Sequence, residues 1–184
     1  DVATGTGDLA LALTSIPNAT ITGIDIAVEM LEIGKQKVNQ NKLDHRIKMV
    51  VGDAESLPLS DASIDAVTVA FGVRNFGDLN KGLSEIYRIL KPGGQLFVLE
   101  TSVPKKQFFR FGYNLYCSLF LPLVGRLFSS DKKAYTYLSD SAAAFPYGEA
   151  FNNKLKKVGF ATIEDHPQTF GVVTIYKATK HIDA

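Results

Sequence analysis

The sequence predicts an α/β domain built on a doubly wound, mostly parallel sheet, and three observations indicate this. Short apolar runs alternate with segments of helical periodicity through residues 1–100. A glycine-containing turn, Gly5-Thr6-Gly7, stands between a strand end and a helix start. The last two apolar runs are separated only by residues 167–170, which is too short for a parallel crossover, so the last strand should be antiparallel. We expect seven strands, with the strand before the glycine turn beginning ahead of residue 1.

The first half of the chain contains the most regular alternation. Residues 19–25 predict a strand that ends at Asp25, and residues 28–41 predict a surface helix. Residues 46–51 predict a third strand that leads into Gly52-Asp53-Ala54. Residues 62–71 are almost continuously apolar, as in a strand covered on both faces.

The second half begins regularly and then changes character. A helix is predicted over residues 79–90, ending at Lys91-Pro92-Gly93-Gly94, and a strand over 96–100. A helix-rich insert then spans about 105–145. The remaining elements are a helix over 148–158, a strand over 160–166 and a final strand over 171–178. The length suits one domain, residues 1–184, that carries the insert within it.

Composition excludes several classes of protein. Lys and Arg number 20 against 19 Asp and Glu, so no overall positive charge favours a nucleic-acid partner. The single cysteine, Cys117, excludes an intramolecular disulfide, and with only three histidines there is no spaced metal-ligand cluster. The longest apolar stretch, residues 111–128, is interrupted by polar residues, a glycine and a proline, and is a poor membrane span. We therefore expect a cytoplasmic, metal-free protein.

The candidate site combines the glycine turn with acidic residues at strand ends. In such sheets ligands bind beyond the carboxyl ends of the strands, where Gly5, Gly7, Asp25 and Asp53 all fall. The pattern Gly5-x-Gly7-x-x-Ala10 with Asp25 fits a dinucleotide as well as another adenosine cofactor. Asp53, which could accept a hydrogen bond from an adenine amino group, and the reversed last strand argue against a nicotinamide. Both acids could instead be solvated, and Thr6 could cap the following helix.

Several motifs resemble a known family. The run Asp1-x-Ala3-x-Gly5-Thr6-Gly7 resembles the first motif of the S-adenosylmethionine-dependent methyltransferases, with Ala3 in place of the usual first glycine. Asp25 resembles the acid that holds the ribose hydroxyls, and Asp53 with Ala54 resembles the pair beside the adenine. Further segments resemble the ubiquinone/menaquinone-biosynthesis C-methyltransferases: residues 71–76, 137–141, 145–146, 158–160 and 170–173. The resemblance covers essentially the whole chain.

The resemblance implies methyl transfer from S-adenosylmethionine to a ring carbon of a polyprenylated quinol, without a metal. Demethylmenaquinol is the expected substrate, and the corresponding benzoquinol of the ubiquinone pathway is the alternative. The resemblance assigns Arg74, as a cation beside the quinol oxygen, and Asn75 to catalysis. It assigns six residues to the cofactor: Gly5, Thr6, Gly7, Asp25, Asp53 and Ala54. Arg74 could instead tie its loop to a carboxylate, and Asn75 could be a turn residue.

The insert bears on the partners of the chain. It carries aromatic residues flanked by cations, so it could cover the quinol and touch an anionic membrane surface, or pack as a helical lid. Peripheral contact at the inner face of the membrane is therefore one expectation, and a homodimer is compatible with the sequence. A nucleic-acid methyltransferase is disfavoured, because residues 71–74 stand where such enzymes carry an Asp/Asn-Pro-Pro-aromatic motif. A different lipid or aromatic acceptor, or a catalytically idle binding protein, remains open.

Overall fold

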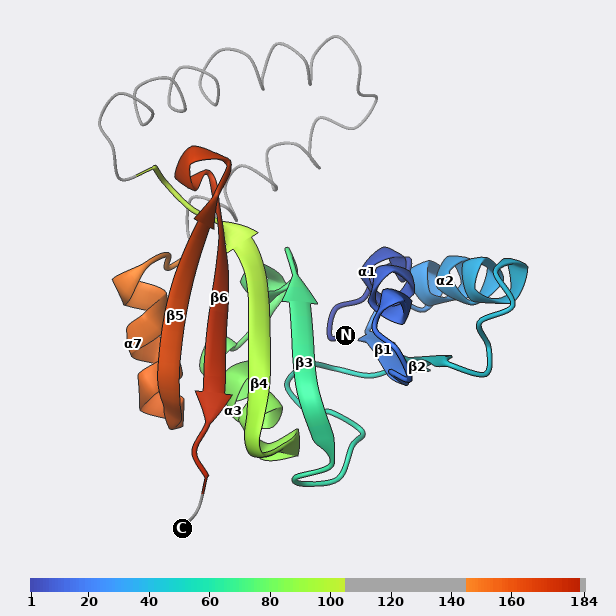
Figure 1. Cartoon of the computed structure of the whole chain (residues 1–184), viewed down its shortest axis with the longest axis horizontal. Helices are drawn as coiled ribbons and strands as arrows, with labels where there is room; N and C mark the ends of the chain where they lie inside the picture. Colours follow the sequence, from blue (N-terminus) through green and yellow to red (C-terminus); the bar gives the residue numbers. More distant parts are fainter. Residues whose placement is uncertain (105–144, 183–184) are drawn as a thin grey trace, which may run out of the picture.

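The computed structural model describes residues 1–104 and 145–182 (Figure 1). The predicted insert over 105–145 lies outside the described residues except for Phe145. Among the described residues, no helix has the length and apolar character needed to cross a bilayer.

Within the two described ranges, six strands form two hydrogen-bonded groups. Four of them make a sheet in the order β3-β4-β6-β5, and β1 pairs with β2 in parallel. Their bounds are β1 (Ile21–Asp25), β2 (Ile47–Val51), β3 (Ile64–Ala70), β4 (Leu90–Thr101), β5 (Phe160–Gln168) and β6 (Val173–Lys180). β3 and β4 are parallel, whereas β6 is antiparallel to both β4 and β5, so the sheet is mixed rather than mostly parallel. The described residues contain six of the seven expected strands.

The first residues of the chain connect the two groups of strands. Val2 forms an isolated parallel bridge with Ile24 of β1. On its other side, the Val2 N–H donates to the carbonyl oxygen of Thr68 in β3 at 2.9 Å. Residues 1–4 therefore run between β1 and β3, and the turn that follows them lies where the two groups of strands meet.

The last strand is antiparallel, as predicted. β6 pairs in the antiparallel sense with both β4 and β5. A short turn, η4 (Thr169–Gly171), connects β5 to β6 and places Phe170 at a positive φ of 57°. Both strands extend two residues beyond their predicted carboxyl ends, at 166 and 178, because their ladder continues from Thr162–Thr179 to Gln168–Val173.

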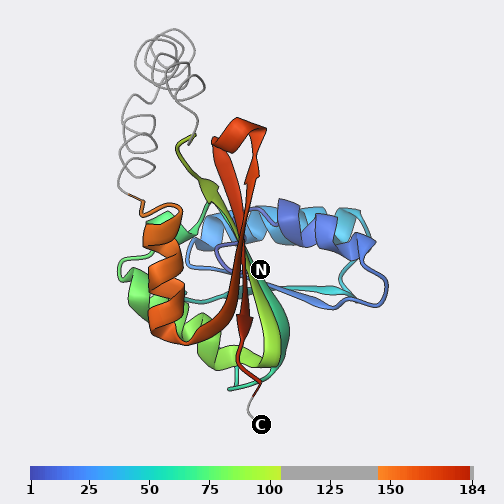
Figure 2. The same ribbon diagram turned by 60° about the vertical axis from the view of Figure 1, so that its left-hand side comes forward.

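Two pairs of helices bury separate apolar clusters. α1 (Asp8–Ala12) and α2 (Val28–Gln40) lie beside β1 and β2, and their cluster contains Ala10 and Val38. α3 (Leu79–Ile89) and α7 (Glu149–Val158) lie side by side against the four-stranded sheet (Figure 2). Their cluster includes Leu83, Ile86, Phe151, Leu155 and Tyr176.

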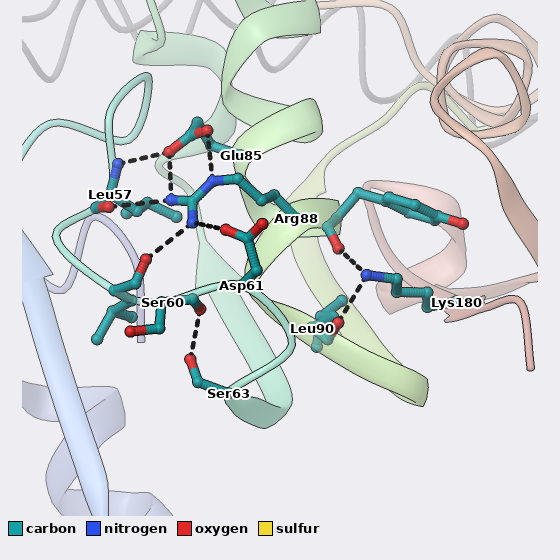
Figure 3. A network of polar contacts seen from close by, with 10 residues as sticks. Leu57, Ser60, Asp61, Ser63, Glu85, Arg88, Leu90 and Lys180 are labelled. Atoms are coloured by element: carbon teal, nitrogen blue, oxygen red, sulfur yellow. Dashed lines mark hydrogen bonds and ion pairs between the residues drawn. The ribbon is translucent and has the colours of Figure 1, made fainter.

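The start of β4 corrects one prediction. The strand begins at Leu90, directly after α3, and not at residue 96. Leu90 pairs with Ile64, and the register then shifts so that Gln95 pairs with Ala66, which leaves residues 91–94 as an irregularity in the ladder. Lys180 supports this junction, because its Nζ donates to the carbonyl oxygens of Tyr87 and Leu90, each at 2.8 Å (Figure 3). These bonds satisfy carbonyls at the end of the helix.

A second polar network holds the loop before β3 against α3. The Arg88 guanidinium donates to the carbonyl oxygens of Leu57 and Leu59 and pairs with Glu85 and Asp61 (Figure 3). The hydrogen bond from Arg88 lowers the pKa of Glu85 below its ordinary value. Ser63 and Leu90 lie beside this network, so it is close to the amino ends of β3 and β4 (Figure 3).

Candidate functional site

The glycine turn and Asp25 are directly bonded. The Gly5 N–H donates to Asp25 Oδ2 at 2.7 Å, and the Ala27 N–H donates to Asp25 Oδ1 at 2.8 Å. The carboxylate therefore holds the turn against the end of β1. Each carboxylate oxygen can accept more than one hydrogen bond, so capacity for a ligand hydroxyl remains.

The backbone of this turn requires small residues. Gly5 and Gly7 have φ values of 55° and 77°, and Ala3 has a φ of 54°. This left-handed region is open to glycine and disfavoured for other residues. A Cβ added to Gly5 would meet only the flexible end of Met30, at 3.4 Å, so the turn leaves room beside Gly5.

Ala3 also contacts the segment that carries Arg74. A Cβ placed on Gly72 would lie 2.4 Å from the Cβ of Ala3, a separation at which one of the two must shift. The turn therefore touches Asp25 on one side and Gly72 on the other. The predicted cofactor residues and the predicted catalytic segment are neighbours.

Asp1 anchors the turn, a role that the sequence did not reveal. Its Oδ1 accepts a hydrogen bond from Thr68 Oγ1 of β3 at 2.8 Å, and its Oδ2 accepts one from Thr4 Oγ1 at 2.6 Å. The sequence does show an acid at the start of the glycine motif. Its partners could not be read from the sequence, because Thr68 lies 67 residues and Thr4 lies 3 residues further along the chain.

Thr6 faces a charged pair. Its hydroxyl donates to Asp8 Oδ2 at 2.8 Å and accepts from Lys37 Nζ at 3.0 Å, while Lys37 and Asp8 form an ion pair. The hydrogen bond from Lys37 lowers the pKa of Asp8. Gly7 is the N-cap residue of α1 and no side chain caps it, so Thr6 does not have the capping role that its position suggested.

Asp53 and Ala54 follow β2 and lie next to Asp25. The Gly52 N–H donates to the carbonyl oxygen of Asp25 at 3.0 Å, which fixes this proximity. The exposed Asp53 carboxylate accepts a hydrogen bond from the Glu55 N–H at 2.8 Å. Ala54 is partly buried against the larger apolar cluster.

Arg74 is paired with a buried carboxylate, Glu100. Arg74 follows β3 in the short helical turn η2 (Val73–Asn75), and Glu100 lies near the carboxyl end of β4. Arg74 Nη1 and Glu100 Oε1 are 2.5 Å apart, and the two side chains are 9% and 0% exposed. The ring of Phe71 lies 5.7 Å from the guanidinium carbon. Arg74 therefore does tie its loop to a carboxylate, which is compatible with a catalytic role.

Glu100 was not among the residues that the sequence predicted for the site. The only signal in the sequence is a glutamate that ends the otherwise apolar run Leu96–Leu99. Glutamate is almost never fully buried unless it is paired. Here its partner, Arg74, lies in the turn after β3, far from Glu100 in the sequence. Asn75, beside Arg74, has an exposed side chain, and its N–H donates to the Gly72 carbonyl oxygen at 2.9 Å.

A cavity of about 530 Å³ lies at the carboxyl end of β4. Its lining combines hydroxyls, carboxylates and apolar side chains, among them Ser102, Thr174, Glu149, Asp165, Tyr147 and Phe170. The hydroxyl oxygens of Ser102 and Thr174 are 2.8 Å apart. Within residues 1–104 and 145–182, no three His, Cys, Asp or Glu side chains gather as a metal site would require.

The family model and the curated relatives agree on one family, and the solved structures support the fold. Residues 1–180 match the ubiE/COQ5 methyltransferase family. A demethylmenaquinone methyltransferase of Bacteroides fragilis is 43% identical over 181 residues, which cover 98% of this chain and 74% of that protein. A ubiquinone/menaquinone biosynthesis C-methyltransferase of Geotalea daltonii is 44% identical over 182 residues, covering 98% and 77%. A solved SAM-dependent methyltransferase of Aquifex aeolicus aligns with a TM-score of 0.68 at 18% identity, covering 97% of this chain and 79% of that one, which supports the fold.

Proposed function

The chain belongs to the ubiE/COQ5 methyltransferase family, and from this premise we propose that it C-methylates demethylmenaquinol with S-adenosylmethionine as the methyl donor. The observation that carries the proposal is the pairing of an adenosine-type turn with Arg74 in one site. Relatives at 43–44% identity bear the names of quinol-pathway methyltransferases, which supports this acceptor class.

The residues of the turn fit the proposed donor. Gly5 and Gly7 hold the backbone in a conformation with room beside it, and Asp25 has acceptor capacity for a pair of ribose hydroxyls. Thr6 lies beside the same turn, and Asp53 with Ala54 lies beside Asp25, where an adenine amino group would find an acceptor. When bound, S-adenosylmethionine supplies an activated methyl group on a sulfonium.

Arg74 has the electrostatic role. The quinol hydroxyl gives up a proton, the ring carbon forms a bond to the methyl group as the sulfur–carbon bond breaks, and that carbon then loses its proton while the hydroxyl regains one. The overall reaction releases one proton. A guanidinium beside the oxygen stabilises the deprotonated form, and because its nitrogens are hydrogen-bond donors only, we assign the proton to another acceptor. Asn75 orients the same oxygen.

The acceptor ring is proposed to occupy the cavity at the end of β4. Its apolar side chains suit a polyprenylated ring, and its hydroxyls suit the ring oxygens. We propose that residues 105–145, whose aromatic side chains are flanked by cations in the sequence, guide the isoprenoid tail and contact an anionic membrane surface. Cosedimentation with anionic lipid vesicles tests the membrane contact, and the absence of any binding contradicts it.

A methylation assay under reducing conditions tests the function. We expect product from demethylmenaquinol and less from the corresponding benzoquinol; the reverse order assigns the chain to the ubiquinone pathway. Calorimetric titration with S-adenosylhomocysteine then tests whether a chain that methylates neither quinol still binds the cofactor. Binding without turnover of either quinol contradicts the proposed function and indicates a catalytically idle binding protein.

A further inference from the structure

The ion pair between Arg74 and Glu100 is incompletely satisfied. Glu100 Oε1 accepts from Arg74 Nη1, from the Thr101 N–H at 2.7 Å and from Thr101 Oγ1 at 3.2 Å. Glu100 Oε2 and Arg74 Nε are both buried without a hydrogen-bond partner among the described residues. A buried ion pair is costly to maintain unless its geometry satisfies both charges. Unsatisfied buried polar atoms in such a pair point to a function other than stability.

The pair lies beside the proposed acceptor cavity. Glu100 and Ser102 are two residues apart at the end of β4, so their side chains share one face of the sheet. Thr174 of β6 pairs with Glu100 in the ladder, and its hydroxyl reaches Ser102. Both Ser102 and Thr174 line the cavity. Glu100 therefore neighbours two residues of the cavity lining, although neither Glu100 nor Arg74 lines the cavity itself.

The two partners differ in how firmly the fold holds them. Glu100 lies on β4, which is hydrogen-bonded to β3 on one side and β6 on the other. Arg74 lies on a three-residue turn, with the Phe71 ring on one side of its guanidinium. A residue on a paired strand is a more exact anchor than one on a loop.

We propose that Glu100 is a positioning residue for Arg74. It holds the guanidinium beside the acceptor cavity, and its negative charge sets how strongly Arg74 stabilises the deprotonated quinol. This inference rests on the proposed function. Other titratable groups on this side of the sheet include Tyr176 of β6, Asp165 of β5 and Glu149 of α7; burial is the main cause that raises the pKa of Tyr176.

If Glu100 acts through its charge, its removal shifts the pH dependence of methyl transfer in one direction, which a purely structural role does not require. The Glu100 carboxylate and the quinol oxyanion compete for the same cation. Replacing Glu100 by glutamine keeps an oxygen that accepts from Arg74 Nη1 but removes the competing charge. The bound quinol hydroxyl should then lose its proton at lower pH, by about one pH unit.

The experiment compares Glu100→Gln with a matched control, Glu85→Gln. Glu85 also pairs with an arginine, Arg88, but at the amino ends of the strands (Figure 3). Single-turnover methyl transfer to demethylmenaquinol is measured against pH for the whole chain, with circular dichroism confirming the fold. The alkaline rise in rate should move about one unit lower in Glu100→Gln. It should stay at the wild-type pH in Glu85→Gln, and the Kd for S-adenosylmethionine, measured by titration, should be unchanged in both.

A second variant separates position from charge. Glu100→Asp keeps the charge on a shorter side chain, so it should keep the wild-type pH midpoint while lowering the rate by about tenfold through misplacement of Arg74. An unshifted midpoint in folded Glu100→Gln, or a wild-type rate in Glu100→Asp, overturns the inference. If the wild-type chain methylates neither quinol, the proposed function fails, and this inference fails with it.

Discussion

The Cβ of Ala3 occupies the space that a side chain at position 72 would need. Ala3 stands where the resemblance of this motif leads us to expect a glycine, and its backbone is left-handed, with a φ of 54°. A Cβ on Gly72 would lie 2.4 Å from it. The space between the two residues therefore holds the methyl group of Ala3 but not a second methyl group at position 72.

Gly72→Ala should lower the free energy of unfolding by about 1–3 kcal/mol, because the added methyl group overpacks this contact. Ala3→Gly should restore most of the loss when the two are combined. Urea unfolding of the four chains in this double-mutant cycle measures the coupling. Additive effects of the two substitutions would show that the contact does not limit stability.

Replacing both members of the Arg74–Glu100 pair should abolish methylation without lowering the free energy of unfolding. Arg74→Met leaves the Glu100 carboxylate buried without its partner and should cost about 3–5 kcal/mol of stability. The double variant Arg74→Met/Glu100→Leu replaces the pair with apolar side chains and should be close to wild-type stability. Both variants should lose quinol methylation. The affinity of the double variant for S-adenosylhomocysteine, measured by calorimetry, should stay near that of the wild type. Methylation of the quinol by this variant would contradict the role of Arg74.

Asp25→Ala should weaken binding of S-adenosylhomocysteine by about tenfold or more, since hydrogen bonds to a charged group contribute about 1.5–3 kcal/mol. The substitution also frees the Gly5 and Ala27 N–H groups that the carboxylate holds. Asp44→Ala, at an exposed turn residue, is the control and should bind normally. Isothermal titration calorimetry measures both, and equal affinities would exclude Asp25 from the site.

The Glu85–Arg88 pair predicts a dependence of stability on acid. Folding lowers the pKa of Glu85 below its ordinary value of 4.5, so the pair stabilises the fold above that pH and the stabilisation is lost as pH falls through the folded pKa. Glu85→Gln should therefore cost about 1 kcal/mol at pH 7. The difference from wild type should close as the pH falls below 4.5 and passes through the lowered pKa of folded Glu85. Denaturant melts across pH 3–7 test this, and a constant difference would assign the loss to packing.

Most elements were predictable because each has a local cause. The apolar spacing of residues 28–41 indicated the helix observed at Val28–Gln40, and the short link before the last strand required its antiparallel direction. The start of β4 was not predictable, because Pro92 and the glycines after it are typical of a turn. Pairing of Leu90 with Ile64 extends the strand through them, and that pairing joins residues 26 apart.

By itself, the sequence determined the alternation of strands and helices, the glycine turn, the acids at the strand ends and the resemblance to a family. These properties depend on residue type and on spacing within one segment. Only the tertiary structure decided which groups meet: Gly5 with Asp25, Asp1 with Thr68, Ala3 with Gly72, and Arg74 with Glu100. Each of these contacts joins segments brought together by the order of neighbouring strands, and pairing across a sheet is set by burial and hydrogen bonding over the whole domain.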